Sequence, residues 1–396
     1  MKIALVAQHA VPLSRSARPA PGTTAACPDV PAGQAEDDIR VRNLSRGLAA
    51  DGHHVTVYAQ KPDGDAPHEA ELCPGVMVSY LGPAVDRDER NLLQRVPGFA
   101  APLRDELGDN PPDVVHAVRW TSGLAALSAA RDLRIPVVQS FSSLYITERR
   151  HRPGPPETGP KRLRLEPAIG RSASAVVTDC EDEESELARA GVPRRAIRVV
   201  PCGVDTARFA PEGPVTDRRG RPRLLTVTDS ADELATALRV LAQVPDAELI
   251  AAGGARSASA ARLAGELGVA DRVEFAGPLT RQSLPPMLRS ADLLLSLSEH
   301  DPAGMMVLEA MACGTPVAAA SGGGHGDAVV DGTTGILIPA RRPAVIAQRV
   351  RGLLSHPMRL AAFGVAASDR ARSRYSWDRI ARETADVYDR AAAVTA

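Results

Sequence analysis

Two acidic residues, Asp301 and Glu309, lie eight positions apart and are the strongest candidates for chemistry in the chain. A Pro-x-Gly turn follows Asp301 and opens a predicted helix that carries Glu309. The N-terminus of a helix offers unpaired backbone N–H groups and a partial positive charge, so it attracts anions. Carboxylates beside it can accept hydrogen bonds from sugar hydroxyls. The pattern therefore predicts a site for a phosphorylated sugar, such as a nucleoside diphosphate sugar.

The elements that position these residues follow from the hydrophobic pattern. Short runs rich in Val, Ile and Leu alternate with helical stretches, such as 39–51 and 183–190, which is typical of parallel sheets with crossover helices. The predicted strands are residues 2–7, 55–59, 76–81, 114–117, 136–140, 175–178 and 197–201 in the first half, and 223–227, 248–252, 273–276, 293–296, 316–319 and 335–338 in the second. The predicted fold class is α/β, with two doubly wound Rossmann-like domains.

Proline and glycine cluster at residues 201–214, where regular patterning lapses, and this predicts the boundary between a first domain of residues 1–200 and a second of residues 201–374. Residues 11–38 are rich in Pro, Ala and Gly and are expected to form a long loop. Loops of this length are functional or merely solvated, and the sequence leaves both readings open.

Composition excludes several classes of function. The net charge of −1, with 44% apolar and 24% charged residues, is ordinary for a soluble globular protein and gives no attraction to nucleic acid or anionic membranes. No run is long enough for a signal peptide or a membrane span. The five cysteines are scattered, and no Asp-x-Asp or His cluster has the spacing of metal ligands. We expect a cytoplasmic protein with reduced thiols, no metal and no cofactor.

Residues 301–339 resemble the donor-site signature of family 4 of the GT-B glycosyltransferases. That signature is a Glu-x7-Glu pair in EPFGxxxLEAMACGTPV, followed by GGxxE and a DGxTG turn. Here Asp301 stands for the first Glu, Ala303 for the Phe, and Asp327 for the Glu after the glycines. The resemblance covers nearly the whole chain and is nearest to an actinobacterial branch that includes mycothiol-pathway and antibiotic-biosynthesis enzymes. It implies two Rossmann-like domains facing a cleft, with a C-terminal helix, 375–396, that joins the first domain.

The resemblance also implies a donor site in the second domain and an acceptor site in the first. Glu309 would bind the ribose hydroxyls of the donor, and Asp301 would hold hydroxyls of the transferred sugar. The other residues implied in donor binding are Gly304, Met305 and Met306 through their amides, Gly277, Pro278 and Leu279 beside the base, and Arg256. Those implied in acceptor binding are Gln8, His9, Gly33, Gln34, Arg119, Ser140, Phe141, Ser142, Arg149, Arg150 and His151. The small-molecule donor and acceptor are the expected partners, and a homodimer is left open.

The chain departs from the family where the donor diphosphate is held. Relatives carry an Arg and a Lys after the first strand of the second domain, whereas this chain has Asp229, Asp232 and Glu233 there. Losing a charge-assisted hydrogen bond to phosphate costs about 1.5–3 kcal/mol. Three arginines are candidates for replacing the missing charge, although arginines are usually solvated surface residues. They are Arg239, Arg256 and Arg281.

Two further departures concern the first domain. Val118 replaces a histidine that relatives often place beside the reacting sugar, which leaves His116 as a packing or hydrogen-bonding residue. Glu148 precedes Arg149 where relatives often have Lys, so an anionic acceptor is less well supported.

The function that the resemblance implies is retaining transfer of a sugar from a UDP- or GDP-sugar to a hydroxyl or thiol of a small molecule, in specialised metabolism. Such transfer is thought to occur on the front face of the sugar, where the departing phosphate oxygen takes the acceptor proton. Two alternatives stay open. One is a catalytically silent homologue that binds a partner protein, because fold does not secure function. The other is a pseudo-glycosyltransferase that uses an activated cyclitol.

Overall fold

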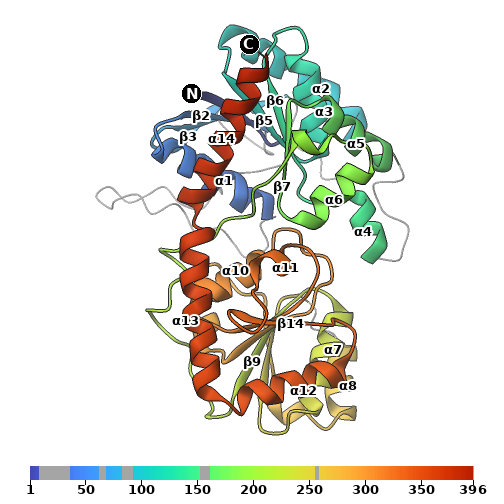
Figure 1. Cartoon of the computed structure of the whole chain (residues 1–396), viewed down its shortest axis with the longest axis vertical. Helices are drawn as coiled ribbons and strands as arrows, with labels where there is room; N and C mark the ends of the chain where they lie inside the picture. The colour runs from blue at the N-terminus through green and yellow to red at the C-terminus, as the bar shows by residue number, and fades with distance from the viewer. Residues whose placement is uncertain (9–35, 62–67, 83–91, 152–160, 255–257, 396) are drawn as a thin grey trace. The chain divides into compact units, whose positions relative to one another are not determined.

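The structure is a computed structural model that describes residues 1–8, 36–61, 68–82, 92–151, 161–254 and 258–395 (Figure 1). The chain forms two compact units. Unit 1 contains the described residues up to Cys202 and the final segment Trp377–Ala396, and unit 2 contains Gly203–Ser376. No helix in the described ranges combines the length and the apolar character needed to cross a membrane.

Unit 1 is built on an eight-stranded sheet in the order β3-β4-β2-β1-β5-β6-β7-β8, in which every pairing is parallel except that of β3 with β4. Its strands are β1 (Lys2–Val6), β2 (His54–Gln60), β3 (Glu69–Cys73), β4 (Val76–Leu81), β5 (Val114–Val118), β6 (Val137–Ser140), β7 (Ala175–Thr178) and β8 (Ile197–Val199). Its helices are α1 (Glu36–Ala50), α2 (Leu92–Asp109), α3 (Trp120–Ala130), α4 (Tyr145–His151), α5 (Arg162–Ser172), α6 (Glu181–Arg189) and α14 (Trp377–Thr395).

The central strands of this sheet are buried along their whole length, as a parallel sheet covered on both faces requires. Helix α14 packs beside α1 (Figure 1). A glycine permits this contact, because a Cβ added at Gly47 would lie 2.8 Å from Cβ of Ala381. The last helix of the chain is therefore part of the first unit's core.

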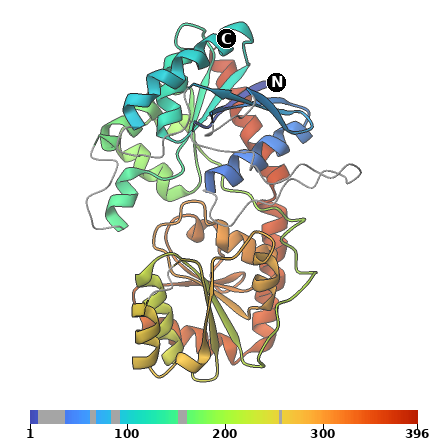
Figure 2. The ribbon, with the colours of Figure 1, turned by 180° about the vertical axis from the view of Figure 1, so that it is seen from behind.

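Unit 2 is built on a six-stranded parallel sheet in the order β11-β10-β9-β12-β13-β14. Its strands are β9 (Arg223–Val227), β10 (Glu248–Ala252), β11 (Val273–Gly277), β12 (Leu293–Ser296), β13 (Val317–Ala320) and β14 (Gly335–Ile338). Its helices are α7 (Ala231–Ala242), α8 (Ala258–Glu266), α9 (Leu284–Ser290), α10 (Met305–Ala312), α11 (Gly324–Ala328), α12 (Pro343–Leu354) and α13 (Pro357–Arg374). Helices α7 and α8 lie on one side of the sheet and α13 on the other (Figure 1, and Figure 2 from behind).

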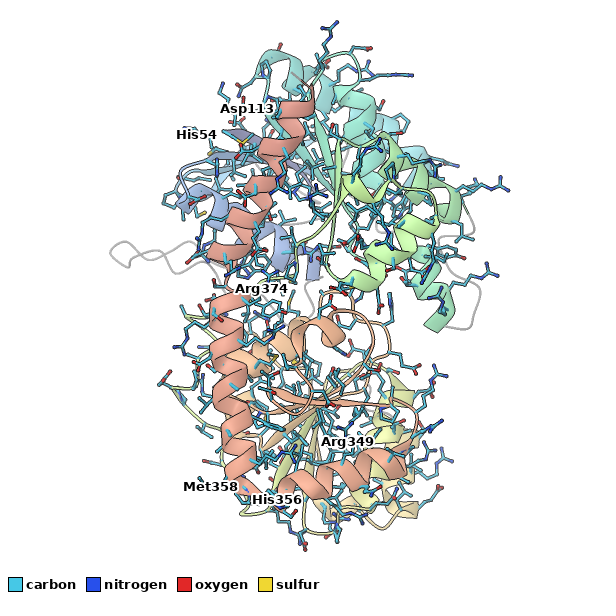
Figure 3. The ribbon with its side chains drawn as sticks, in the orientation of Figure 1. His54, Asp113, Arg349, His356, Met358 and Arg374 are labelled. Atoms are coloured by element: carbon cyan, nitrogen blue, oxygen red, sulfur yellow. The ribbon has the colours of Figure 1, made fainter. Side chains whose placement is uncertain are left out.

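The turn at Asp331-Gly332, which the sequence pattern singles out, is held by its own unit. The Asp331 carboxylate accepts a hydrogen bond from the Leu337 amide at 2.8 Å and lies 3.2 Å from the guanidinium of Arg349 on α12 (Figure 3). Gly332 has a φ of 77°, which favours glycine. These contacts give the turn a structural role.

Candidate active site

Asp301 precedes the N-terminus of α10, and Glu309 lies in the middle of this eight-residue helix. Asp301 lies in the loop between β12 and α10, and its Oδ1 accepts a hydrogen bond from the Gly304 amide at 2.8 Å. Gly304 has a φ of 59°, and this left-handed residue turns the chain into the helix. The amides of Met305 and Met306 follow in the first helical turn, where N–H groups have no carbonyl partner within the helix. The loop therefore presents a carboxylate and backbone donors together.

The glycine run after β13 lets this loop approach the next turn closely. The Gly324 amide donates to the Asp301 carbonyl at 2.9 Å. A Cβ added at Gly323 would lie 2.7 Å from the Asp301 carbonyl oxygen, and one at Gly324 would lie 2.4 Å from that of Pro302. Neither distance is tolerated, so side chains are excluded at both positions and the two backbones fix each other.

Asp301 is also bonded to a histidine that the motif did not suggest. Nε2 of His325, in α11, lies 3.2 Å from Asp301 Oδ2. The imidazole and the Gly304 amide lower the pKa of the Asp301 carboxyl, although burial opposes them as the largest single effect. The carboxylate is therefore kept charged at neutral pH.

Glu309 is buried on α10 and forms an ion pair with Arg281, from the loop between β11 and α9. The side chains of Glu309 and Arg281 are 3% and 13% exposed. The Arg281 guanidinium also lies 4.8 Å from the ring centroid of Phe209. Burial raises the pKa of Glu309, and Arg281 opposes this shift. Arg281, one of the three candidate replacement cations, is thus partly buried and paired with a carboxylate of the candidate site.

The other two replacement cations do not lie in this arrangement. Arg239 is exposed on α7, and Arg256 lies outside the described residues. Two of the acidic residues near the start of α7 have local partners instead: Asp229, just before the helix, and Glu233, in its first turn. The Asp229 carboxylate accepts from the Gly254 amide at 2.5 Å, and Glu233 accepts from the Thr228 hydroxyl at 2.7 Å. Asp229 and Glu233 are thus hydrogen-bonded to neighbouring groups at the start of α7.

The segment expected beside the base lies at the carboxyl edge of the unit 2 sheet. Strand β11 ends at Gly277, and Pro278 and Leu279 follow it. Gly277 has a φ of 70°, and its carbonyl accepts from the Gly253 amide at 2.8 Å. Pro278 is exposed and Leu279 half-buried. Ligands in open α/β sheets bind outside the carboxyl ends of the strands, and this is where the segment lies.

In unit 1, His116 is buried in β5 and hydrogen-bonded at both ring nitrogens. Nδ1 lies 2.7 Å from the Tyr388 hydroxyl of α14, and Nε2 lies 2.7 Å from the Ser140 hydroxyl. Burial, with a smaller effect of Arg40, lowers the pKa of His116 to about 3. The ring is neutral and fully engaged, and Val118 two residues on is buried as well.

Two of the three arginines expected at the acceptor site, Arg119 and Arg150, are already paired with carboxylates. Arg119 has a φ of 72°, a strained value for a residue with a side chain, and its Nε lies 3.0 Å from Asp37 Oδ2. The same carboxylate accepts a hydrogen bond from the Ser142 hydroxyl. Nη1 of Arg150 lies 3.0 Å from Glu186 Oε1. An anion bound here would have to compete with these carboxylates.

The remaining residues of the expected acceptor site differ in how far they are exposed, and some lie outside the described residues. Arg149 is exposed on α4, and Phe141 is buried in a hydrophobic cluster. Gln8 is fully buried at the end of β1, and its side-chain amide has no hydrogen-bond partner among the described residues. Three expected positions, His9, Gly33 and Gln34, lie outside the described residues, and so does the side chain of His151.

Comparisons with known proteins agree with this architecture. Residues 39–208 match the family model described as Glycosyltransferase Family 4, and residues 225–370 match that described as Glycosyl transferases group 1. D-inositol 3-phosphate glycosyltransferase 2 of Catenulispora acidiphila is 31% identical over 98% of this chain and 95% of its own. A D-inositol 3-phosphate glycosyltransferase of Streptomyces bingchenggensis is 30% identical over 89% and 84%.

Comparison with solved structures also finds glycosyltransferase folds. A sucrose-phosphate synthase from Thermosynechococcus elongatus superposes with a TM-score of 0.83 at 26% identity over 99% of both chains. Anabaena HepE in complex with UDP and glucose superposes with a TM-score of 0.71 at 18% identity over 98% of both chains, a likeness of fold. The chain therefore belongs to family 4 of the glycosyltransferases and is a glycosyltransferase of the GT-B fold.

Proposed function

We propose that this enzyme is a retaining glycosyltransferase that takes a sugar from a nucleoside diphosphate sugar and transfers it to a hydroxyl or thiol of a small molecule. The observation that carries the proposal is the grouping of polar groups around α10. Asp301 lies with the first amides of the helix at its N-terminus, and Glu309, further along the helix, is paired with Arg281, which lies over the ring of Phe209. Sugar hydroxyls, ribose hydroxyls and phosphate each find a complementary group there.

Each group has a proposed role. Glu309 accepts hydrogen bonds from the ribose hydroxyls, and Asp301 accepts them from the transferred sugar. The amides of Met305 and Met306, with the dipole of α10, stabilise the negative charge on the leaving diphosphate. Arg281 supplies positive charge for the diphosphate. The Arg and Lys that relatives use for this are replaced here by acidic residues at the start of α7. The base lies against residues 277–279.

The mechanism proposed for proton transfer requires no strong protein base. In front-face transfer, the departing phosphate oxygen takes the proton of the acceptor as the new bond to the sugar forms on the same face. The state of His116 supports this, because the ring is buried and bonded to Tyr388 and Ser140, with its pKa lowered to about 3. Such a histidine is not placed to accept a proton from an incoming substrate.

A catalytically silent binding protein is the second candidate. The feature that favours it is the Arg281–Glu309 ion pair, which already satisfies the carboxylate expected to bind ribose. Isothermal titration with UDP, GDP, ADP and dTDP separates the two. A transferase binds one of these nucleotides, and Glu309→Gln weakens that binding roughly 10- to 150-fold because charged hydrogen bonds worth about 1.5–3 kcal/mol are lost.

Glu212→Gln, at an exposed position of the same unit, is the control and should bind the nucleotide like the wild type. Absence of binding by every nucleotide would refute the transferase proposal and favour the silent protein. Equal affinity of wild type and Glu309→Gln would refute the role given to Glu309.

A further inference from the structure

His325 lies wholly buried beside the carboxylate that the proposed function gives to the donor sugar. It is the second residue of α11, and its side chain is 0% exposed whereas that of Asp301 is 18% exposed. Nδ1 lies 3.2 Å from the Ala320 carbonyl oxygen, and Nε2 lies 3.2 Å from Asp301 Oδ2 and 3.3 Å from the Ser296 hydroxyl. Every polar atom of the ring is thus engaged inside unit 2.

The partners fix where the protons of the ring lie. A carbonyl oxygen only accepts hydrogen bonds, so Nδ1 carries a proton. An ionised carboxylate also only accepts, so Nε2 carries one when it bonds to Asp301. The Ser296 hydroxyl, 3.3 Å from Nε2, can accept a hydrogen bond as well as donate one. The ring therefore bridges the Ala320 carbonyl oxygen and the Asp301 carboxylate, which fixes the imidazole and the carboxylate against each other.

The same contacts leave Asp301 able to bind a ligand. A carboxylate offers about four lone-pair directions, and the Gly304 amide and His325 occupy one on each oxygen. The part of Asp301 that stays exposed can still accept a hydrogen bond. Because both oxygens are held, the remaining acceptor directions are fixed in space rather than free to rotate. This matters for a side chain one methylene shorter than the glutamate of the family signature.

We propose that His325 is a positioning residue that orients Asp301, so that the carboxylate can accept hydrogen bonds from the hydroxyls of the donor sugar. The inference rests on the proposed function. His325 contributes to recognition of the sugar and not to recognition of the nucleotide, since its described contacts are with residues 296, 301 and 320.

The test compares the affinity for a nucleotide with that for the same nucleotide carrying glucose. UDP and UDP-glucose are the probes, or GDP and GDP-glucose if the protein selects GDP. The sugar increment is the ratio of the two affinities. His325→Leu should keep nucleotide affinity within about threefold while reducing the sugar increment about tenfold or more, which is the effect of losing one charge-assisted hydrogen bond. Asp301→Asn should do the same.

Further variants separate positioning from simple folding. His325→Gln keeps a neutral donor for Asp301 and should restore part of the sugar increment. Ser296→Ala removes the other partner of Nε2 without touching Asp301, and should leave the increment unchanged. The double variant His325→Leu/Asp301→Asn should lose no more than either single variant, because both act on one interaction.

Three results would overturn the inference. Equal weakening of nucleotide and nucleotide sugar by His325→Leu would show a structural residue only. A normal increment in His325→Leu together with a reduced one in Asp301→Asn would show that Asp301 needs no positioning. Failure of the wild type to bind any nucleotide would overturn the proposed function and this inference together, which distinguishes that case from the first two.

Discussion

Replacing Arg281 with Met should destabilise unit 2 far more than loss of an ordinary surface charge. Breaking a buried ion pair by removing one partner typically costs about 3–5 kcal/mol, against about 0–1 kcal/mol for an exposed pair. The pair with Glu309 belongs to the first class, because its two side chains are only 13% and 3% exposed. Met keeps an apolar chain against Phe209, so the loss comes mainly from the unpaired carboxylate.

Urea unfolding can assign this loss to one unit. Both tryptophans, Trp120 and Trp377, belong to unit 1, so tryptophan fluorescence follows that unit while far-UV circular dichroism follows both. With an m-value of about 2 kcal/mol/M, a loss of about 3–5 kcal/mol moves a transition by roughly 1.5–2.5 M. Arg281→Met should shift the part of the dichroism transition that belongs to unit 2 and leave the fluorescence transition in place. Arg239→Met, at an exposed position, should change neither by more than about 0.5 kcal/mol.

The pH dependence of this variant has a defined sign. Without Arg281, burial acts unopposed by its main cation and raises the pKa of Glu309 further. A buried acid with a raised pKa loses stability as pH rises, because the unfolded chain releases its proton first. The loss caused by Arg281→Met should therefore be larger at pH 8 than at pH 5. A loss below about 1 kcal/mol, or a double variant with Glu309→Gln that loses the sum of the two single losses, would refute the reasoning.

Two other predictions concern the core of each unit. Burial and the neighbouring Asp179 raise the pKa of Glu183 to about 8, so between about pH 4.3 and 8 the folded chain holds a proton that the unfolded chain lacks. The free energy of unfolding relative to Glu183→Gln should fall by about 1.4 kcal/mol per pH unit in this window, and a flat difference would contradict the assignment. In unit 2, Gly364→Ala places a Cβ 2.2 Å from a backbone oxygen and should destabilise by several kcal/mol, whereas Gly352→Ala meets nothing within 4 Å and should stabilise by about 0.5–1 kcal/mol in thermal unfolding. Equal effects of the two glycine substitutions would contradict the packing described.

The α/β fold was predictable because parallel strands buried on both faces leave an unbroken apolar signal. Each predicted strand is found within one or two residues of its expected ends. Strand β3 was not predicted, because Glu69 and Glu71 break the apolar pattern of this edge strand. The Pro74-Gly75 turn before β4 was the one local signal of a hairpin here. Edge strands that carry charge are common, and their pairing is visible only in three dimensions.

The candidate site was predictable where its residues are close in sequence and not where they are distant. Asp301 and Glu309 are joined by one turn and one helix, so their spacing alone brings them to α10. Arg281, from the loop after β11, and His325, from α11, reach them from elsewhere in the chain, and the residues next to them in the sequence do not indicate a carboxylate partner. The expectation that Arg281 is a solvated surface residue was wrong, because the loop after β11 brings it against Glu309 of α10 within unit 2.

The hydrogen bond between His116 and Tyr388 joins positions 272 residues apart and has a consequence for synthesis on the ribosome. The first unit to emerge cannot close its core until α14, the last helix, has also been made. Until then, the face of its sheet that α14 covers stays open to water. The residues of unit 2 end at Ser376, so that unit is fully synthesised before α14 is made. The nascent chain should therefore complete its units in the reverse of their order, and a fragment ending at Cys202 should depend on chaperones unless α14 is fused to it.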